Sequence, residues 1–171
     1  PKELSLKVLD MGMGHERVPW FSSGAVTSYD STFPSVCDYL YSQTGISIDK
    51  DLKKIFPYSS LLNIDEIENI GKVWKIVSEK SGISIEEIKR KLLPLSGIYS
   101  IADHSRSLLV AFSDGALPSN RGGGYNLRII FRRMLSFIDK YNWSIDINHI
   151  MKLHADYLKP LFPELSENMK E

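Results

Sequence analysis

A glycine run followed by three arginines has the residue types and spacing best suited to chemistry. Residues 122–124 are all glycine, and the next stretch, which has helical periodicity, carries Arg128, Arg132 and Arg133. Backbone N–H groups at the start of a helix can accept a phosphate, and guanidinium groups match phosphate oxygens and base edges. The pattern therefore indicates an anionic ligand, although a solvated helix face beside a flexible loop would explain the same residues.

The positive charge in this region is local. The chain has 171 residues with 21 basic and 21 acidic side chains, so its formal net charge is zero. Residues 96–133, by contrast, hold five arginines against Asp103 and Asp114. The five are Arg106, Arg121, Arg128, Arg132 and Arg133. Because the whole molecule has no positive field, any nucleic-acid role must come from such a patch.

A second glycine turn lies near the N-terminus. Gly12 and Gly14 precede Arg17, and such a turn with an arginine after it could hold a nucleotide phosphate. The stretch is neither a P-loop, since no Gly-Lys-Ser/Thr follows, nor a complete G-x-G-x-x-G motif. A structural turn between a strand and a helix is the alternative explanation.

The sequence offers little for a metal site or a disulfide. Its four histidines are scattered, and Cys37 is its single cysteine. We therefore expect no zinc site, no internal disulfide and a reducing, cytoplasmic setting. No apolar run approaches the roughly 20 residues of a membrane span, so no membrane partner is expected. The chain shows no signal peptide and begins with Pro1 rather than methionine, which indicates a processed or excised piece.

The remaining pattern is that of a helical globular protein. Hydrophobic residues make up 43% of the chain and charged residues 25%, which suits a protein that buries a core. We predict a mainly α fold, an irregular antiparallel helical bundle with one short N-terminal strand. The strand is expected at residues 4–9, and the helices at 15–21, 34–43, 49–56, 63–81, 84–93, 96–113, 125–141 and 146–158. Residues 22–32 are expected to form a polar connection, and the tail 164–171 to fray.

Capping signals support these boundaries. Ser84 with Glu87, and Asn63 with Glu66, have the spacing of a capping box, in which each side chain bonds a backbone N–H. Gly82 is expected to end the preceding helix, because glycine readily adopts the left-handed conformation of a C-terminal cap.

Several stretches resemble the alanyl-tRNA synthetases. Residues 101–106 (IADHSR), 114–120 (DGALPSN) and 124–133 (GYNLRIIFRR) match that family's pattern in the same order. Residues 10–17 (DMGMGHER) look like motif 3 of class II synthetases, and residues 28–34 (SYDSTFP) look like the archaeal branch. The resemblance spans most of the chain and is least distinctive over residues 44–95.

The resemblance implies two regions and a reaction. Residues 1–33 would be the C-terminal end of a class II catalytic domain, and residues 34–171 a helical domain that recognises the tRNA acceptor stem. The family activates alanine with ATP and Mg²⁺ and transfers it to tRNA. Its motif 3 arginine, which maps onto Arg17, contacts the ATP γ-phosphate, while Gly12 and Gly14 would let the backbone approach the nucleotide.

For the helical region, the resemblance implies recognition of a G·U wobble pair in the acceptor stem. Asn120 would contact a base edge, because an amide both donates and accepts hydrogen bonds in the minor groove. The phosphates or flanking nucleotides would be held by Arg121, Arg128, Arg132 and Arg133. The same surface would be organised by Asp103, His104 and Arg106.

Other parts of the family's pattern have no match in this sequence. Class II motifs 1 and 2, the second part of the tRNA-recognition region and the editing domain with its zinc ligands are absent. We therefore expect the chain to be part of a longer synthetase and to be inactive in aminoacylation alone. We expect no cofactor bound to it, and its expected partners are tRNA(Ala) and the rest of the synthetase. Two alternatives are a stand-alone helical RNA-binding module and a purely structural helical protein.

Overall fold

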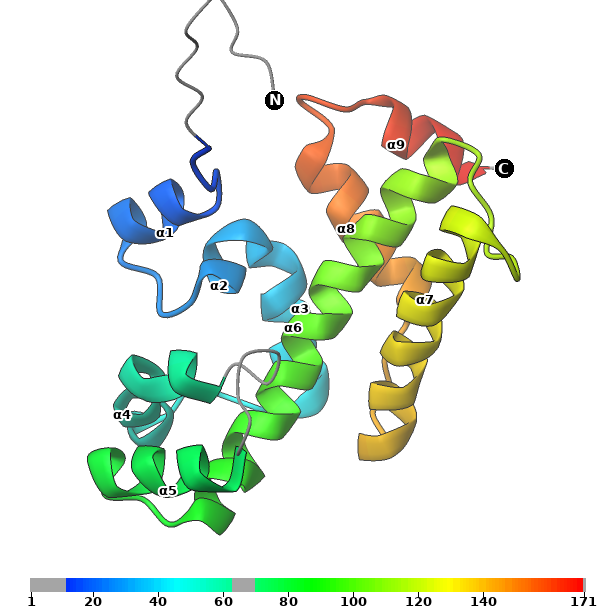
Figure 1. The fold of residues 1–171 in the computed structure, drawn as a ribbon. Coiled ribbons are helices and arrows are strands. Elements are labelled where there is room, and N and C mark those ends of the chain that lie inside the picture. The colour runs from blue at the N-terminus through cyan, green and yellow to red at the C-terminus, as the bar shows by residue number, and fades with distance from the viewer. Residues whose placement is uncertain (1–11, 63–69, 171) are drawn as a thin grey trace, which may run out of the picture.

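The protein is described by a computed structural model over residues 12–62 and 70–170, and within these ranges it is helical without a strand (Figure 1). The mainly α fold is thus confirmed. The strand predicted at residues 4–9 and the capping box predicted at Asn63 and Glu66 lie outside the described residues.

The helices follow one another with short connections. Their bounds are α1 Arg17–Ser23, α2 Ser28–Thr32, α3 Pro34–Thr44, α4 Lys50–Ser59, α5 Ile70–Ser81, α6 Ile85–Ser113, α7 Gly122–Tyr141, α8 Ile147–Leu158 and α9 Glu164–Glu167. Single 3₁₀ turns follow α4, at Ser60–Leu62, and α9, at Asn168–Lys170.

Helix α6 is the central element against which the others pack. Helices α4 and α5 lie beside its N-terminal half, and α7, α8 and α9 lie along its C-terminal half (Figure 1). Its buried side chains include Ile88, Leu95, Ile98 and Leu108, each almost fully inaccessible to solvent. One apolar core therefore runs along α6 from Ile88 to Leu108, and a second, smaller cluster of Leu109, Ala155 and Leu165 lies at the C-terminal end of the helix.

The prediction of two helices separated at Pro94 was wrong, because α6 continues through that residue for 29 residues. Proline lacks the N–H that would bond one turn back, which usually breaks or kinks a helix. Here Ile88, Leu95 and Ile98 all face the core, in the same apolar stripe on both sides of Pro94. Burial of this continuous stripe offsets the lost hydrogen bond, which a local sequence rule does not weigh.

Three shorter stretches also differ from the prediction. The connection predicted over residues 22–32 contains the short helix α2, which Thr27 caps by accepting a hydrogen bond from the Asp30 N–H. Helix α7 begins at Gly122, within the run predicted as loop. The tail forms α9 rather than fraying, because Leu165 is buried and Asn168 donates hydrogen bonds to Ser113.

Of the capping signals within the described residues, the Ser84 cap and the Gly82 helix end are confirmed, whereas the Glu87 carboxylate accepts hydrogen bonds from Arg90. The Ser84 hydroxyl accepts a hydrogen bond from the Glu87 backbone N–H at the start of α6. Gly82 follows α5 with a φ of 70°, and its N–H bonds the Ser78 carbonyl. These local contacts set where α5 ends and α6 begins, and so fix the turn between the two helices.

Candidate nucleic-acid interface

The loop between α6 and α7 folds back on itself through its serine. The Ser119 N–H donates to the Gly124 carbonyl at 2.9 Å, and the Ser119 hydroxyl donates to the Arg121 carbonyl at 3.0 Å. The Arg121 N–H in turn donates to that hydroxyl at 3.4 Å. These bonds hold the exposed residues 117–121 against the first turn of α7 in a defined conformation.

Gly124 is required by this close approach. A Cβ atom at Gly124 would lie 2.7 Å from the Leu117 carbonyl oxygen and also overlap the Ser119 hydroxyl. At Gly123 the same atom would meet nothing within 4 Å. Of these two glycines in the run, Gly124 is therefore the one that the loop needs for packing, and its role is structural rather than that of a flexible spacer.

The loop and the helix are further joined by their side chains. The guanidinium of Arg128 donates a hydrogen bond to the side-chain oxygen of Asn120. An amide oxygen has two lone pairs and the amide nitrogen has two N–H groups. Asn120 is thus oriented by Arg128 while one acceptor position and both donors can still meet a ligand. Both residues are exposed.

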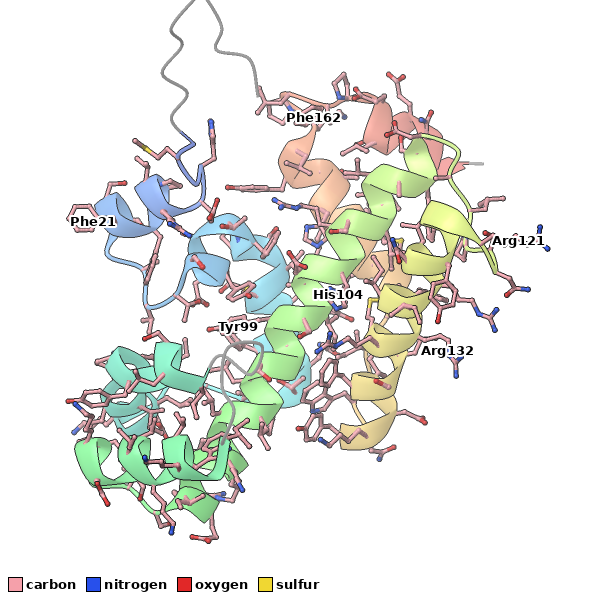
Figure 2. The ribbon with its side chains drawn as sticks, viewed as in Figure 1. Phe21, Tyr99, His104, Arg121, Arg132 and Phe162 are labelled. Carbon is pink, nitrogen blue, oxygen red and sulfur yellow. The ribbon has the colours of Figure 1, made fainter. Side chains whose placement is uncertain are left out.

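The basic face of α7 is directed away from the core. Arg128, Arg132 and Arg133 are all exposed, whereas Met134 is fully buried against α6. Figure 2 shows Arg121 and Arg132 projecting into solvent from this side of the molecule. Residues 122–138 contain no acidic side chain. We define Asn120, Arg121, Arg128, Arg132 and Arg133 as the α7 basic face.

The start of α7 adds backbone donors to this face. Its N-terminal cap is Arg121, and no side chain caps the helix. The first N–H groups of a helix lack partners within the helix and lie at the positive end of its dipole. In the same region a phosphate or a base acceptor would meet both these groups and the guanidinium groups.

The structure places Arg106 and Asp103 apart from the α7 basic face. Gly97 faces α7, since a Cβ there would lie 3.2 Å from Phe137. Arg106 is nine residues further along α6, which is about two and a half helical turns, and so points to the opposite side. Its guanidinium carbon lies 4.6 Å from the centre of the Phe33 ring.

Asp103 lies on the α2 side of α6, where burial and the charge of Asp103 raise the pKa of Tyr29. Its carboxylate is 3.2 Å from His104 Nδ1, and this hydrogen bond, with the nearby charge of Arg106, lowers the pKa of Asp103. The predicted group of tRNA-binding residues therefore divides into the α7 basic face and a separate Asp103–Arg106 region.

A buried histidine that the sequence did not single out, His154, holds α8 to α6. His154 Nε2 lies 3.0 Å from both the Ser105 hydroxyl and the Ala102 carbonyl oxygen. Burial lowers the pKa of His154 to about 4, so the ring is neutral near pH 7. Its place four residues after the buried Ile150 could have revealed it as a core position. Ser105 is also buried.

The N-terminal candidates lie on the other side of α6 from α7 in the view of Figure 1. Arg17 begins α1 with 78% of its side chain exposed, and its Nε is 3.7 Å from Glu16 Oε1. The Gly14 carbonyl accepts the Arg17 N–H at 3.1 Å, in a turn over residues 14–17 that leads into α1, while the strand predicted before the glycines lies outside the described residues. Phe21, on the same helix, is 91% exposed and points outward (Figure 2).

The described residues contain neither a candidate metal site nor a helix suited to crossing a membrane. There, no three or more His, Cys, Asp or Glu side chains come together as a metal site. Cys37 is buried, and burial raises the pKa of its thiol to about 12. Over the same ranges, no helix has both the length and the apolar character that crossing a bilayer requires.

Comparison with known proteins agrees with this arrangement of motifs. The family model of class II tRNA synthetases (A) matches residues 2–171. The alanine–tRNA ligase of Methanocella arvoryzae is 46% identical over 97% of the chain, and that of Nitrosopumilus maritimus is 40% identical over 96%. The ligase of Methanosphaera stadtmanae is 33% identical over 98%.

These relatives are much longer than the chain, which spans 19%, 18% and 19% of their respective lengths. The family match nevertheless extends over nearly every residue, including both glycine motifs and the α7 basic face. The chain therefore belongs to the family of class II tRNA synthetases (A).

Proposed function

We propose that this chain is the part of an alanine–tRNA ligase that connects the ATP site to the domain that recognises the tRNA acceptor stem. Residues 1–33 contribute motif 3 of the catalytic domain, and residues 34–171 form the acceptor-stem recognition domain. The complete enzyme uses ATP with Mg²⁺ to attach alanine to tRNA(Ala). The chain alone lacks the other catalytic motifs and does not aminoacylate.

The observation that carries the proposal is the hydrogen bond from Arg128 to Asn120 on the α7 basic face. It presents an oriented amide beside three further exposed arginines, the combination needed to read a base edge and hold phosphates. In A-form RNA the wide minor groove exposes base edges, and guanine presents an amino group there. The remaining acceptor position of Asn120 suits that amino group in a G·U pair.

On the nucleotide side, Arg17 is the group proposed to contact the ATP γ-phosphate. Its exposure and its place three residues after Gly14 support this role, because a guanidinium matches phosphate oxygens. Gly12 has open space around it, which would let a nucleotide approach the backbone. Arg17 lies next to Glu16 in this structure, so ATP would compete with that carboxylate.

Binding to acceptor-stem hairpins tests the RNA part of the proposal. A hairpin with a G·U pair should bind more tightly than the same hairpin with G·C, and Asn120→Ala should remove about 1–3 kcal/mol of that preference. Asn126→Ala, which removes an exposed amide on α7, is the matched control and should keep the preference. Absence of binding at low salt would refute this function.

Catalysis tests the other part. The chain alone should give no alanine-dependent exchange between ATP and pyrophosphate. Adding the remaining catalytic part of the synthetase in trans should restore aminoacylation, whereas a stand-alone RNA-binding module would bind RNA without any such rescue. In the complete enzyme, Arg17→Ala should lower the exchange rate and leave hairpin binding unchanged.

A further inference from the structure

Asp30 stands at the centre of a cluster of hydroxyl groups from separate elements. The Tyr41 hydroxyl of α3 donates to Asp30 Oδ1 at 2.6 Å, and the Tyr99 hydroxyl of α6 donates to Asp30 Oδ2 at 3.1 Å. Thr27, which caps α2, donates to Oδ2 at 2.6 Å. The two tyrosine hydroxyls are also 3.0 Å apart. One carboxylate on α2 thus binds both α3 and α6.

The cluster is partly enclosed, which strengthens these bonds. Hydrogen bonds to a charged acceptor contribute more than neutral ones, and more so away from water. Burial and, for Tyr41, the bond to Asp30 raise the pKa of both tyrosines, so both hydroxyls stay protonated as donors. Tyr29 stacks on the Tyr99 ring with centroids 4.6 Å apart and adds a second contact between α2 and α6.

This cluster is one of the contacts that hold α1 and α2 on the rest of the protein, beside the buried Phe33 ring that follows α2. Helix α1 packs mainly on α2, and the Trp20 indole N–H bonds the Ala25 carbonyl at 2.8 Å between them. A cleft of about 630 Å³ separates this pair from α4, with Trp20 and Lys53 among its lining residues. Among these two helices it is α2 that contacts α3 and α6, and Asp30 lies at this contact.

We propose that Asp30 is a positioning residue for alanine transfer, a role that rests on the proposed function. Through Tyr41 and Tyr99 it fixes the helices that carry Arg17 relative to α6, on which the α7 basic face is mounted. Activation of alanine needs only the nucleotide side. Transfer also needs the RNA end to reach the activated alanine. It therefore depends on how the helices that carry Arg17 are oriented relative to α6, which Asp30 sets.

The test uses the complete synthetase with Tyr41→Phe, Tyr99→Phe and the double variant, which remove the hydroxyls and keep the rings. Alanine-dependent ATP–pyrophosphate exchange reports activation, and single-turnover transfer from preformed alanyl-adenylate reports the second step. We expect exchange within about twofold of wild type and transfer reduced about tenfold or more in the double variant, because small misplacements are costly for reacting groups. Asp30→Asn should act in the same direction.

Tyr39→Phe is the matched control, because the Tyr39 hydroxyl also joins two helices. It accepts the Asp146 N–H at 3.2 Å, between α3 and the start of α8, and leaves α2 untouched. This variant should keep both activities, and all variants should bind tRNA equally. A parallel fall of exchange and transfer, unchanged transfer in the double variant, or an equal effect of Tyr39→Phe would overturn the inference. A wild-type enzyme without alanine-dependent exchange would instead refute the proposed function.

Discussion

Arg128 donates a hydrogen bond to the side chain of Asn120, eight residues earlier in the chain and on the other side of the glycine run. The contact links a loop residue to a rigid helix, so that the amide is held before any ligand arrives. Preorganised groups bind with a smaller entropic cost than flexible ones. The pair also gives Arg128 a role that differs from that of the neighbouring arginines.

Arg128→Lys should separate these roles. Lysine keeps the positive charge but lacks the planar fork that holds the amide, so overall RNA affinity should stay similar while the preference for G·U over G·C falls several-fold. The measurement is a pair of binding titrations with the two hairpins. Arg133→Lys should change neither quantity, and Asn120→Ala combined with Arg128→Lys should lose no more preference than Asn120→Ala alone.

Arg132→Ala and Arg133→Ala should weaken binding of every hairpin alike. Each arginine that contacts a phosphate releases counterions, so its removal should reduce the slope of log affinity against log salt by about 1. Titrations at several salt concentrations measure the slope. Lys140→Ala, in the last turn of the same helix and packed over Tyr141, should leave the slope unchanged, and an equal effect there would argue against a localised face.

Gly124→Ala and Gly123→Ala form a matched pair in the glycine run. A methyl group at Gly124 meets the Leu117 carbonyl oxygen, so the substitution should destabilise the fold by about 1–3 kcal/mol and reduce hairpin discrimination. At Gly123 there is open space, and alanine favours a helix over glycine by up to about 1 kcal/mol, so stability should hold or rise. Urea unfolding distinguishes the two; equal stability of both variants would contradict the packing argument.

His154 should make stability depend on pH. Its pKa is lowered to about 4 in the folded protein, mainly by burial, while an unfolded histidine titrates near 6.5. Between these values the unfolded state binds more protons, so the free energy of unfolding falls as pH drops from about 6.5 to about 4, by about 3 kcal/mol at most. Above about pH 6.5 the imidazole is neutral in both the folded and the unfolded state, so His154 no longer makes the free energy of unfolding depend on pH.

Urea midpoints of the wild type and His154→Leu at several pH values measure that dependence. The wild type should lose more stability than the variant over this interval, while both share the losses from acidic groups such as Asp103, whose pKa is lowered. His149→Gln, an exposed site on the same helix, should follow the wild type. Identical slopes for the wild type and His154→Leu would rule out a buried neutral imidazole.

Much of the fold was predictable because helices follow local rules. Apolar periodicity located α3 and most of α7 and α8, and caps such as Ser84 and Gly82 marked boundaries, since these contacts involve residues only three or four positions apart. The failures lie where distant contacts prevail. Pro94 stays helical because the core holds both sides of it, and the tail is ordered because Leu165 finds a buried site beside Leu109 and Ala155.

The candidate site was only partly predictable for the same reason. The arginines of α7 share a face by helical spacing, and the sequence places them together. Nothing in the sequence spacing separates Arg106 from them, because the direction of a side chain depends on which face of α6 packs against α7. The bond between Asn120 and Arg128 likewise depends on how the loop closes over Gly124.

The sequence by itself determined the helical class, the family and the local basic character of α7, because these reside in residue types, order and short-range periodicity. Only the tertiary structure decided which residues meet across long separations: His154 with Ser105, and Asp30 with Tyr41 and Tyr99. Such contacts arise when helices bury their apolar faces against one another, and that packing is a property of the whole core rather than of any single segment.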